Sequence, residues 1–156
     1  MTLSIIPTVE EIFQAARHQI LAQHEGLRPH LRRALEIAQA AARDDPDAVD
    51  VLPSQIMLLL AELKSHMAYE ESVLLPILAG NGALGPEQCE VLMREHAQQR
   101  DEFSALFELA RGKTDPAGLA RALQILVGAV LADMAQEEQR LAHERIVVAP
   151  PRWAVS

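Results

Sequence analysis

Apolar residues recur three and four positions apart through most of the chain, the spacing that lines one face of an α-helix. Four stretches carry this pattern, and proline, glycine and capping residues separate them. The predicted helices cover residues 8–43, 54–78, 86–111 and 116–145, and an extended C-terminal tail follows over 146–156. Long helices joined by short loops predict an all-α fold, an up-down-up-down antiparallel four-helix bundle.

Particular residues set the ends of these helices. Thr8 and Glu11 have the spacing of a capping box, which begins the first helix. Pro29 lies inside that helix and lacks the N–H needed for its hydrogen bond, so we expect a kink or a short break there. Ser54, which follows a proline, is expected to begin the second helix.

Length and composition narrow the class of protein. The chain has 156 residues, 49% of them hydrophobic, so residues 1–156 are expected to form a single domain with one core. The 22 acidic residues outnumber the 14 basic ones and give a net charge of −8, which argues against nucleic-acid and membrane partners. The single Cys89 excludes a disulfide framework within the chain. No secretion signal and no run of about 18 apolar residues is found, so we expect a cytoplasmic protein.

Residues that can bind a metal interrupt the inward face of every predicted helix. They are, in chain order, His24, His66, Glu70, His96, Asp133 and Glu137. His66 and Glu70 lie four residues apart and so share one helix face, and Asp133 and Glu137 repeat this spacing. At about 1.5 Å per residue, the candidate ligands of the last three helices agree in level within about two turns, and the first helix can place His24 in the same layer. Ionised carboxylates are costly in an apolar core unless they are paired or bound to a cation, so a metal centre is predicted.

The ligand types narrow the choice of metal. Imidazole and carboxylate ligands without sulfur suit iron or manganese, and zinc stays open. Because carboxylates can bridge, the six side chains fit two ions better than one. Such a pair of ions leaves positions for solvent, an oxo or hydroxo bridge and a small exogenous ligand. Glu71 and Glu138 each follow a predicted ligand but turn about 100° away from it, so we expect them on a solvated face.

The order of these motifs resembles the hemerythrin-like family, also called the HHE cation-binding domain, over roughly residues 8–145. The matching stretches are His24-Glu25-Gly26-Leu27-Arg28, His66-Met67-Ala68-Tyr69-Glu70-Glu71, Glu95-His96 and Asp133-Met134-Ala135-Gln136-Glu137-Glu138. The resemblance implies a four-helix bundle with a non-haem di-iron centre. In it, Glu70 and Glu137 would bridge the two iron ions, and His24, His66 and His96 would be terminal ligands.

Two positions depart from the family pattern. Asp133 stands where the family normally has histidine, and Arg100 stands where the oxygen-carrying hemerythrins have a second histidine in the third helix. The arginine argues against an oxygen-carrier role. Asp133 would supply an anionic ligand that favours the higher oxidation state of iron. Alternatively, Asp133 pairs with Arg100 and the site holds a single ion.

The leading functional hypothesis is a di-iron protein that binds or reduces a small ligand such as O2, NO or peroxide. The alternative is a metal- or redox-responsive sensor or regulatory bundle without turnover, in which the tail around Trp153 meets a partner. A third interpretation is a bundle with a vestigial site. The tail is expected to lie over the bundle or over a neighbouring subunit, which leaves a homodimer open, and the sequence does not decide whether the protein is an enzyme.

Overall fold

The structure, a computed structural model, describes residues 5–80 and 85–143. The predicted tail over 146–156 and the last two residues of the predicted fourth helix lie outside the described residues. In chain order the elements are α1 (Val9–Ala42), α2 (Pro46–Tyr69), the π-helical segment η1 (Glu70–Leu74), α3 (Leu75–Ala79), α4 (Gly85–Arg111) and α5 (Pro116–His143). Helix α2, η1 and α3 follow one another without interruption and form one rod of the bundle.

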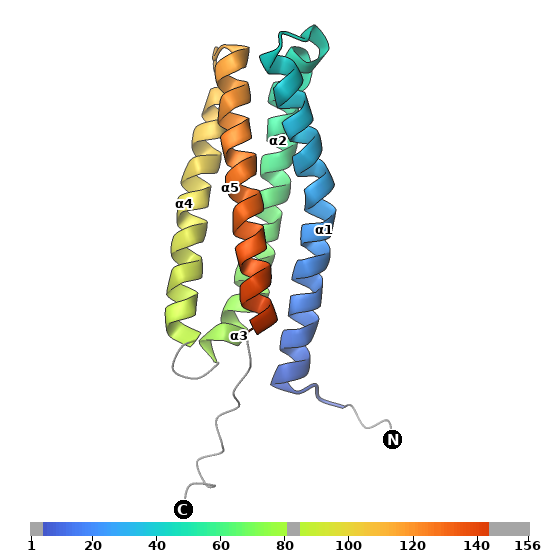
Figure 1. Cartoon of the computed structure of the whole chain (residues 1–156). Coiled ribbons are helices and arrows are strands. Elements are labelled where there is room, and N and C mark those ends of the chain that lie inside the picture. The colour runs from blue at the N-terminus through green and yellow to red at the C-terminus, as the bar shows by residue number, and fades with distance from the viewer. Residues whose placement is uncertain (1–4, 81–84, 144–156) are drawn as a thin grey trace, which may run out of the picture.

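The four rods run antiparallel to their neighbours (Figure 1). Helix α1 packs against α2 and α5, and α4 packs against the same two helices from the other side. Contact between α4 and α5 is looser than contact between α1 and α5. The residues that the structure describes contain helices and no strand, so the predicted all-α, antiparallel four-helix bundle is confirmed.

Helix α1 begins where the sequence predicts. The Thr8 side chain accepts from the Glu11 N–H and the Glu11 side chain accepts from the Thr8 N–H, which completes the capping box. The helix then continues through Pro29, so the short break that we expected there is wrong. A proline inside a helix costs about 3 kcal/mol, and the burial of Leu27 and Leu31 on either side of it offsets this cost.

Helix α2 begins at Pro46, so the predicted start at residue 54 is also wrong. The side chain of Asp45 accepts hydrogen bonds from two backbone N–H groups of the first turn and caps the helix at that point. Pro53 therefore lies inside α2 rather than before it. The additional turns bury Leu52 in the core, which favours helix despite the proline.

One wide turn, η1, interrupts the regular helix in the second rod. In it the Leu75 N–H donates to the carbonyl of Glu70, five residues earlier, instead of four. Pro76 follows at once, and its ring would clash with the carbonyl four residues before it in a regular α-helix. Turns of this kind are rare and often occur at functional sites. Here the wide turn begins at Glu70, one of the predicted metal ligands.

The wide turn also shifts which residues face inward. A strict 3.6-residue period predicts Val73 and Ile77 on the inward face, but both are only half-buried. Leu74 and Leu78 are buried instead. A π turn contains more residues than an α turn, so every inward position beyond Glu70 moves one residue along the chain.

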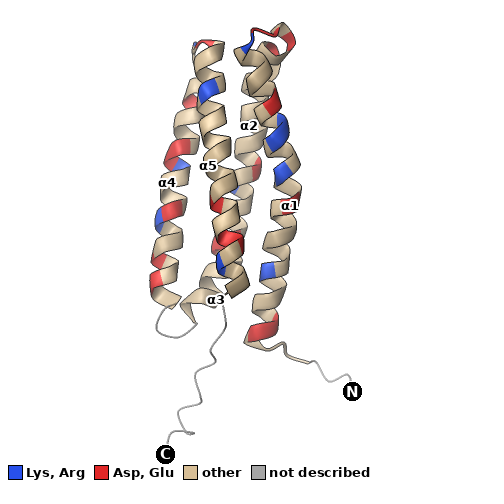
Figure 2. Ribbon diagram, in the orientation of Figure 1, with Lys and Arg blue, Asp and Glu red and all other residues tan. Residues whose placement is uncertain are grey.

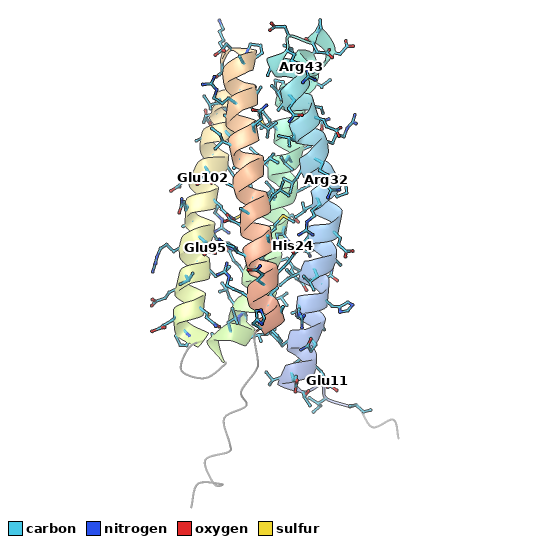
Figure 3. All side chains as sticks on the ribbon, in the orientation of Figure 1. Glu11, His24, Arg32, Arg43, Glu95 and Glu102 are labelled. Carbon is cyan, nitrogen blue, oxygen red and sulfur yellow. The ribbon has the colours of Figure 1, made fainter. Side chains whose placement is uncertain are left out.

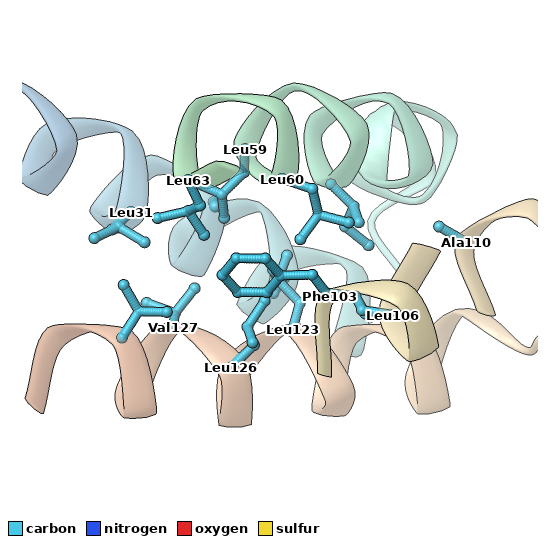
Figure 4. Packing of buried hydrophobic residues seen from close by; sticks show 14 of the residues in the cluster. Leu31, Leu59, Leu60, Leu63, Phe103, Leu106, Ala110, Leu123, Leu126 and Val127 are labelled. Carbon is cyan, nitrogen blue, oxygen red and sulfur yellow. The ribbon is translucent and has the colours of Figure 1, made fainter. Parts of the chain in front are cut away.

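Two apolar cores lie on opposite sides of a polar layer. The larger core extends from this layer to the α1–α2 and α4–α5 connections, and Figure 4 shows part of it around Phe103. The smaller core lies towards the other end and consists of Phe13, Ile20, Leu74, Leu78, Leu92 and Leu141. Between them, His24, Glu70 and His96 are the buried polar residues of the described chain. The fold therefore holds titratable side chains inside an otherwise apolar interior.

Helix α5 divides into an apolar half and a charged half. Its charged residues gather mainly in the C-terminal half, beside the polar layer (Figure 2). By length and hydropathy alone, α5 is the one described helix that could cross a membrane. This is a weak indication, because the core helix of a bundle passes the same test, and Leu123 and Val127 of α5 are fully buried.

Candidate metal centre

Four side chains from three rods meet in the polar layer. His24 comes from α1, His66 from the last turn of α2, Glu70 from the start of η1 and Glu137 from α5. One ligand atom of each lies within 4.8 Å of the ligand atoms of the others. His24 is 0% exposed and Glu70 is 2% exposed, whereas the side chains of His66 and Glu137 keep 10% and 15% of their surface exposed, so the cluster is largely but not fully screened from solvent (Figure 3, where His24 is labelled).

The ring nitrogens of this cluster face carboxylate oxygens. Nε2 of His66 contacts Oε1 of Glu70, four residues further along the same rod. Nε2 of His24 lies 3.1 Å from Nε2 of His66 and 3.2 Å from Oε1 of Glu137. Two imidazole nitrogens and two carboxylates therefore converge on one small volume, the arrangement that holds a divalent cation with nitrogen and oxygen ligands.

His96 approaches Glu70 from the opposite side. Its Nε2 lies 3.1 Å from Oε2 of Glu70, whereas Oε1 of the same carboxylate faces His66. The two oxygens of Glu70 thus point at histidines on two different helices. A carboxylate in this position can bridge two metal ions.

The outward nitrogens of His24 and His66 are also engaged. Nδ1 of His24 donates to Oε1 of Glu138 at 3.1 Å, and the same oxygen accepts from Nη2 of Arg28 at 2.5 Å. Nδ1 of His66 donates to Oε1 of Gln23 at 2.5 Å. An oxygen acceptor at Nδ1 fixes the proton on that nitrogen and leaves Nε2 as the metal-binding atom.

His96 has the same arrangement on the other side of the cluster. Its Nδ1 donates to Oε1 of Glu71 at 2.9 Å, and Nη2 of Arg100 lies 2.6 Å from both oxygens of that carboxylate. Glu71 and Glu138 are only 22% and 27% exposed, so our expectation that they lie on a solvated face is wrong. Each of them instead joins a histidine of one helix to an arginine one turn further along.

Burial and hydrogen bonding have opposite effects on the pKa of Glu70. Burial alone would raise this pKa, but the hydrogen bonds with His66 and His96 outweigh burial and hold it well below the usual range. For Glu137, burial raises the pKa, the attraction of the nearby His24 opposes this, and the charge of Glu70 raises the pKa further. The carboxylates of Glu70 and Glu137 therefore repel each other, and a nearby positive charge would stabilise both.

The histidines respond to this surplus of negative charge. Burial lowers the pKa of His24, but Glu137 and Glu138 outweigh it, so the pKa ends above its ordinary value. His96 behaves in the same way through Glu70 and Glu71. A proton on Nε2 takes the place that a cation would take, so metal binding is expected to release protons.

The surroundings of Oε1 of Glu137 indicate whether the cluster fits a cation. Oε1 of Glu137 is buried and forms no hydrogen bond with any residue that the structure describes. It lies 3.2 Å from Nε2 of His24, but the geometry is not that of a hydrogen bond. An unpartnered buried carboxylate oxygen is costly. A cation held between Glu137, Glu70 and the histidines satisfies it, so the residues present fit a metal.

Asp133 is not part of the buried cluster. Its side chain is exposed and its Oδ2 accepts from Nε2 of Gln99 at 2.7 Å. Met134, the next residue, takes the inward position. The expectation that Asp133 faces inward is therefore wrong, and so is its pairing with Arg100, which binds Glu71 instead. Asp133 still borders the small cavity beside the cluster, and its role as a ligand stays a prediction.

A four-helix bundle with buried histidines and carboxylates across its rods defines a helical cation-binding protein. Residues 15–144 match the family model described as the Hemerythrin HHE cation binding domain. This match spans most of the chain, and the chain belongs to that family. No curated protein and no solved structure matched the chain in the two further comparisons. The predicted family is thus confirmed, together with a His/Glu cation site, while the ligand role of each residue stays a prediction.

The hydrogen bonds at Nδ1 of the three histidines are expected to hold the rings in position for metal binding, and one of these bonds can be removed by mutation. Replacing Glu138 with alanine removes the acceptor of His24 Nδ1 and the partner of Arg28. Metal affinity is expected to fall about 10- to 100-fold, because the imidazole loses its fixed orientation. Titration of the apo-protein with metal against a competing chelator measures this change. Glu102→Ala, at an exposed position of α4, is the matched control, and equal losses in both variants would contradict the assigned role.

Proposed function

We propose that the centre binds two iron ions bridged by Glu70, and that these bind or reduce a small ligand such as O2, NO or peroxide. The observation that carries the proposal is the position of the Glu70 carboxylate between His66 and His96. Its Oε1 faces His66, and its Oε2 faces His96 at 3.1 Å. One carboxylate therefore has an oxygen available for each of two cations.

The candidate ligands divide into two groups, one for each proposed ion. His24, His66 and Glu137 would hold one ion together with Oε1 of Glu70. His96 would hold the other together with Oε2 of Glu70. Iron suits this set because the ligands are imidazole and carboxylate without sulfur, and when bound it supplies redox chemistry and ligand-binding positions. Manganese and zinc are the competing metals for the same ligands.

The size of the space beside the cluster supports a small exogenous ligand. A cavity of about 40 Å³ is lined by the four clustered residues themselves, so the proposed ions and any ligand bound to them would share this small space. Leu27, Phe103 and Val130 form part of its apolar wall. Diatomic molecules and hydrogen peroxide fit a space of this size, whereas larger organic substrates do not.

Arg100 favours reaction or sensing over oxygen carriage. Nη2 of Arg100 lies 2.6 Å from both oxygens of Glu71, and the guanidinium is 43% exposed. It therefore orients Glu71 behind His96 and adds no ligand to the ion proposed there. An ion with fewer protein ligands has more positions for exogenous molecules.

Metal analysis and optical spectra test the proposal directly. The protein, purified without added metal and then loaded with iron under reducing conditions, is expected to contain two iron ions per chain. Exposure to air should then produce ferric charge-transfer absorption. A protein that takes up no iron and shows no such absorption would refute the proposal. Multiple turnover of peroxide or NO by the loaded protein would identify an enzyme, and binding without turnover would favour the regulatory alternative.

A further inference from the structure

A large groove opens between α4 and α5 on the side of the bundle where these helices are in loose contact. Its volume is about 850 Å³, within the range of small-molecule sites in proteins. Leu78, Leu92 and Leu141 contribute to its apolar surface. This groove is distinct from the cavity of about 40 Å³ that adjoins the metal centre.

The groove and the inner cavity share part of their walls. Glu95, Glu137 and Arg140 line both of them. Glu137 belongs to the metal cluster itself. The side chains that the two spaces share therefore lie between the outer groove and the metal centre.

Glu95 and Arg140 form an ion pair across this partition. Nη2 of Arg140, on α5, donates to Oε2 of Glu95, on α4, at 3.2 Å. Both side chains are partly exposed, so the pair can open without breaking the buried core. Figure 3 labels Glu95 on α4 and His24 on α1 at a similar height along the bundle.

We propose that exogenous ligands reach the metal centre through the α4–α5 groove, that the Glu95–Arg140 ion pair limits what passes to small molecules and ions, and that the carboxylates along the route disfavour anions. The proposal rests on the proposed function, because it names the class of ligand that the same centre receives. Molecules larger than a few atoms enter the groove of about 850 Å³ but stop at the pair, because the cavity behind it measures only about 40 Å³.

Charge along the route selects against anions. The carboxylates of Glu87, Glu95 and Glu137 line the groove, against the single guanidinium of Arg140 and the imidazole of His143. A surplus of carboxylates lowers the local concentration of anions and raises that of cations. Uncharged ligands such as O2, NO or hydrogen peroxide are unaffected, and metal cations are attracted along the same route.

Two single substitutions in the 156-residue chain separate the steric effect from the charge effect. Glu95→Ala and Arg140→Ala both remove the ion pair, but they change the charge of the route in opposite directions. Stopped-flow mixing of the iron-loaded protein with NO, which is uncharged, and with azide, an anion at neutral pH, gives the association rates. Both variants are expected to bind NO faster than the wild type. The ratio of the azide rate to the NO rate should rise on the order of fivefold in Glu95→Ala and fall by a similar factor in Arg140→Ala.

The uptake of cobalt(II) by the apo-protein gives a readout that does not depend on the chemistry of bound iron. Its rate, followed by visible absorption, should rise more in Arg140→Ala than in Glu95→Ala, because the route then loses its guanidinium. Glu108→Ala and Arg111→Ala are the matched controls, since they make the same charge changes at an exposed pair near the far end of α4. Rates in these two controls are expected to equal those of the wild type.

The outcomes distinguish the access route from the function it serves. Iron-loaded wild-type protein that binds neither NO nor azide would refute the proposed function, and cobalt uptake would still decide the route. Cobalt uptake that is unchanged in both variants, or that changes equally in the variants and their controls, would overturn the proposed route. A ratio of azide to NO rates that moves in the same direction in both variants would overturn the proposed charge selection.

Discussion

Replacing Glu70 with glutamine is expected to remove most of the metal that the protein binds. The change keeps the size of the side chain but removes the charge that faces His66 and His96. Loss of a residue that only orients a ligand lowers metal affinity about 10- to 100-fold, and loss of a direct, bridging ligand should exceed that. Metal content per chain, measured after equilibration with metal and desalting, checks the result.

Glu62→Gln is the matched control for this substitution. Glu62 lies two turns earlier on α2, is 40% exposed and contacts His30 rather than the cluster. The control is expected to keep its full metal content and its helical circular dichroism. A Glu70→Gln protein that holds as much metal as the control would contradict the bridging role. A Glu70→Leu protein that gains stability without losing metal would instead support a vestigial site.

The architecture was predictable because the apolar period extends over long helices. The period located all four rods, and the capping residues fixed the start of α1 at Thr8. Prolines were the unreliable signal, since Pro29 and Pro53 both lie inside helices. A proline has a fixed local cost, whereas the burial of neighbours such as Leu31 and Leu52 depends on the whole bundle.

The inward placement of His24, Glu70 and His96 is confirmed by their burial. It could be predicted because a polar residue that interrupts an apolar face is visible in the sequence itself. Asp133 was placed inward by the same reasoning and is exposed. The face that contains Val130 continues three or four residues later, at Asp133 or at Met134, because both spacings fit an α-helix. The apolar Met134 is the one that is buried.

The hydrogen bonds from Nδ1 of His24 and His96 to carboxylates were not predicted from the sequence. Glu71 and Glu138 each follow a cluster carboxylate, and they bind Arg100 and Arg28 on other helices. A repeated signal was present, because an arginine follows a histidine by four residues in both α1 and α4. Which carboxylate such an arginine meets depends on the rotation of each helix, and sequence spacing within one helix does not fix that rotation.

Loading the apo-protein with metal is expected to raise its melting temperature by about 8 to 16 °C. A cation at about 1,000 times its dissociation constant stabilises the folded state by about 4 kcal/mol. For a chain of this size, each kcal/mol corresponds to about 2–4 °C. The gain arises because the cation satisfies Oε1 of Glu137 and offsets the repulsion between Glu137 and Glu70. Thermal unfolding followed by circular dichroism, with metal and with chelator, measures the shift.

A shift alone does not locate the cation, because a chain with a net charge of −8 also attracts divalent ions at its surface. Glu70→Gln separates the two contributions, since it alters the buried cluster and leaves the surface carboxylates in place. The variant should show only the small shift that surface ions produce. Equal shifts in the variant and the wild type would place the stabilising cation outside the His/Glu cluster, and the difference between the two shifts measures the contribution of the centre itself.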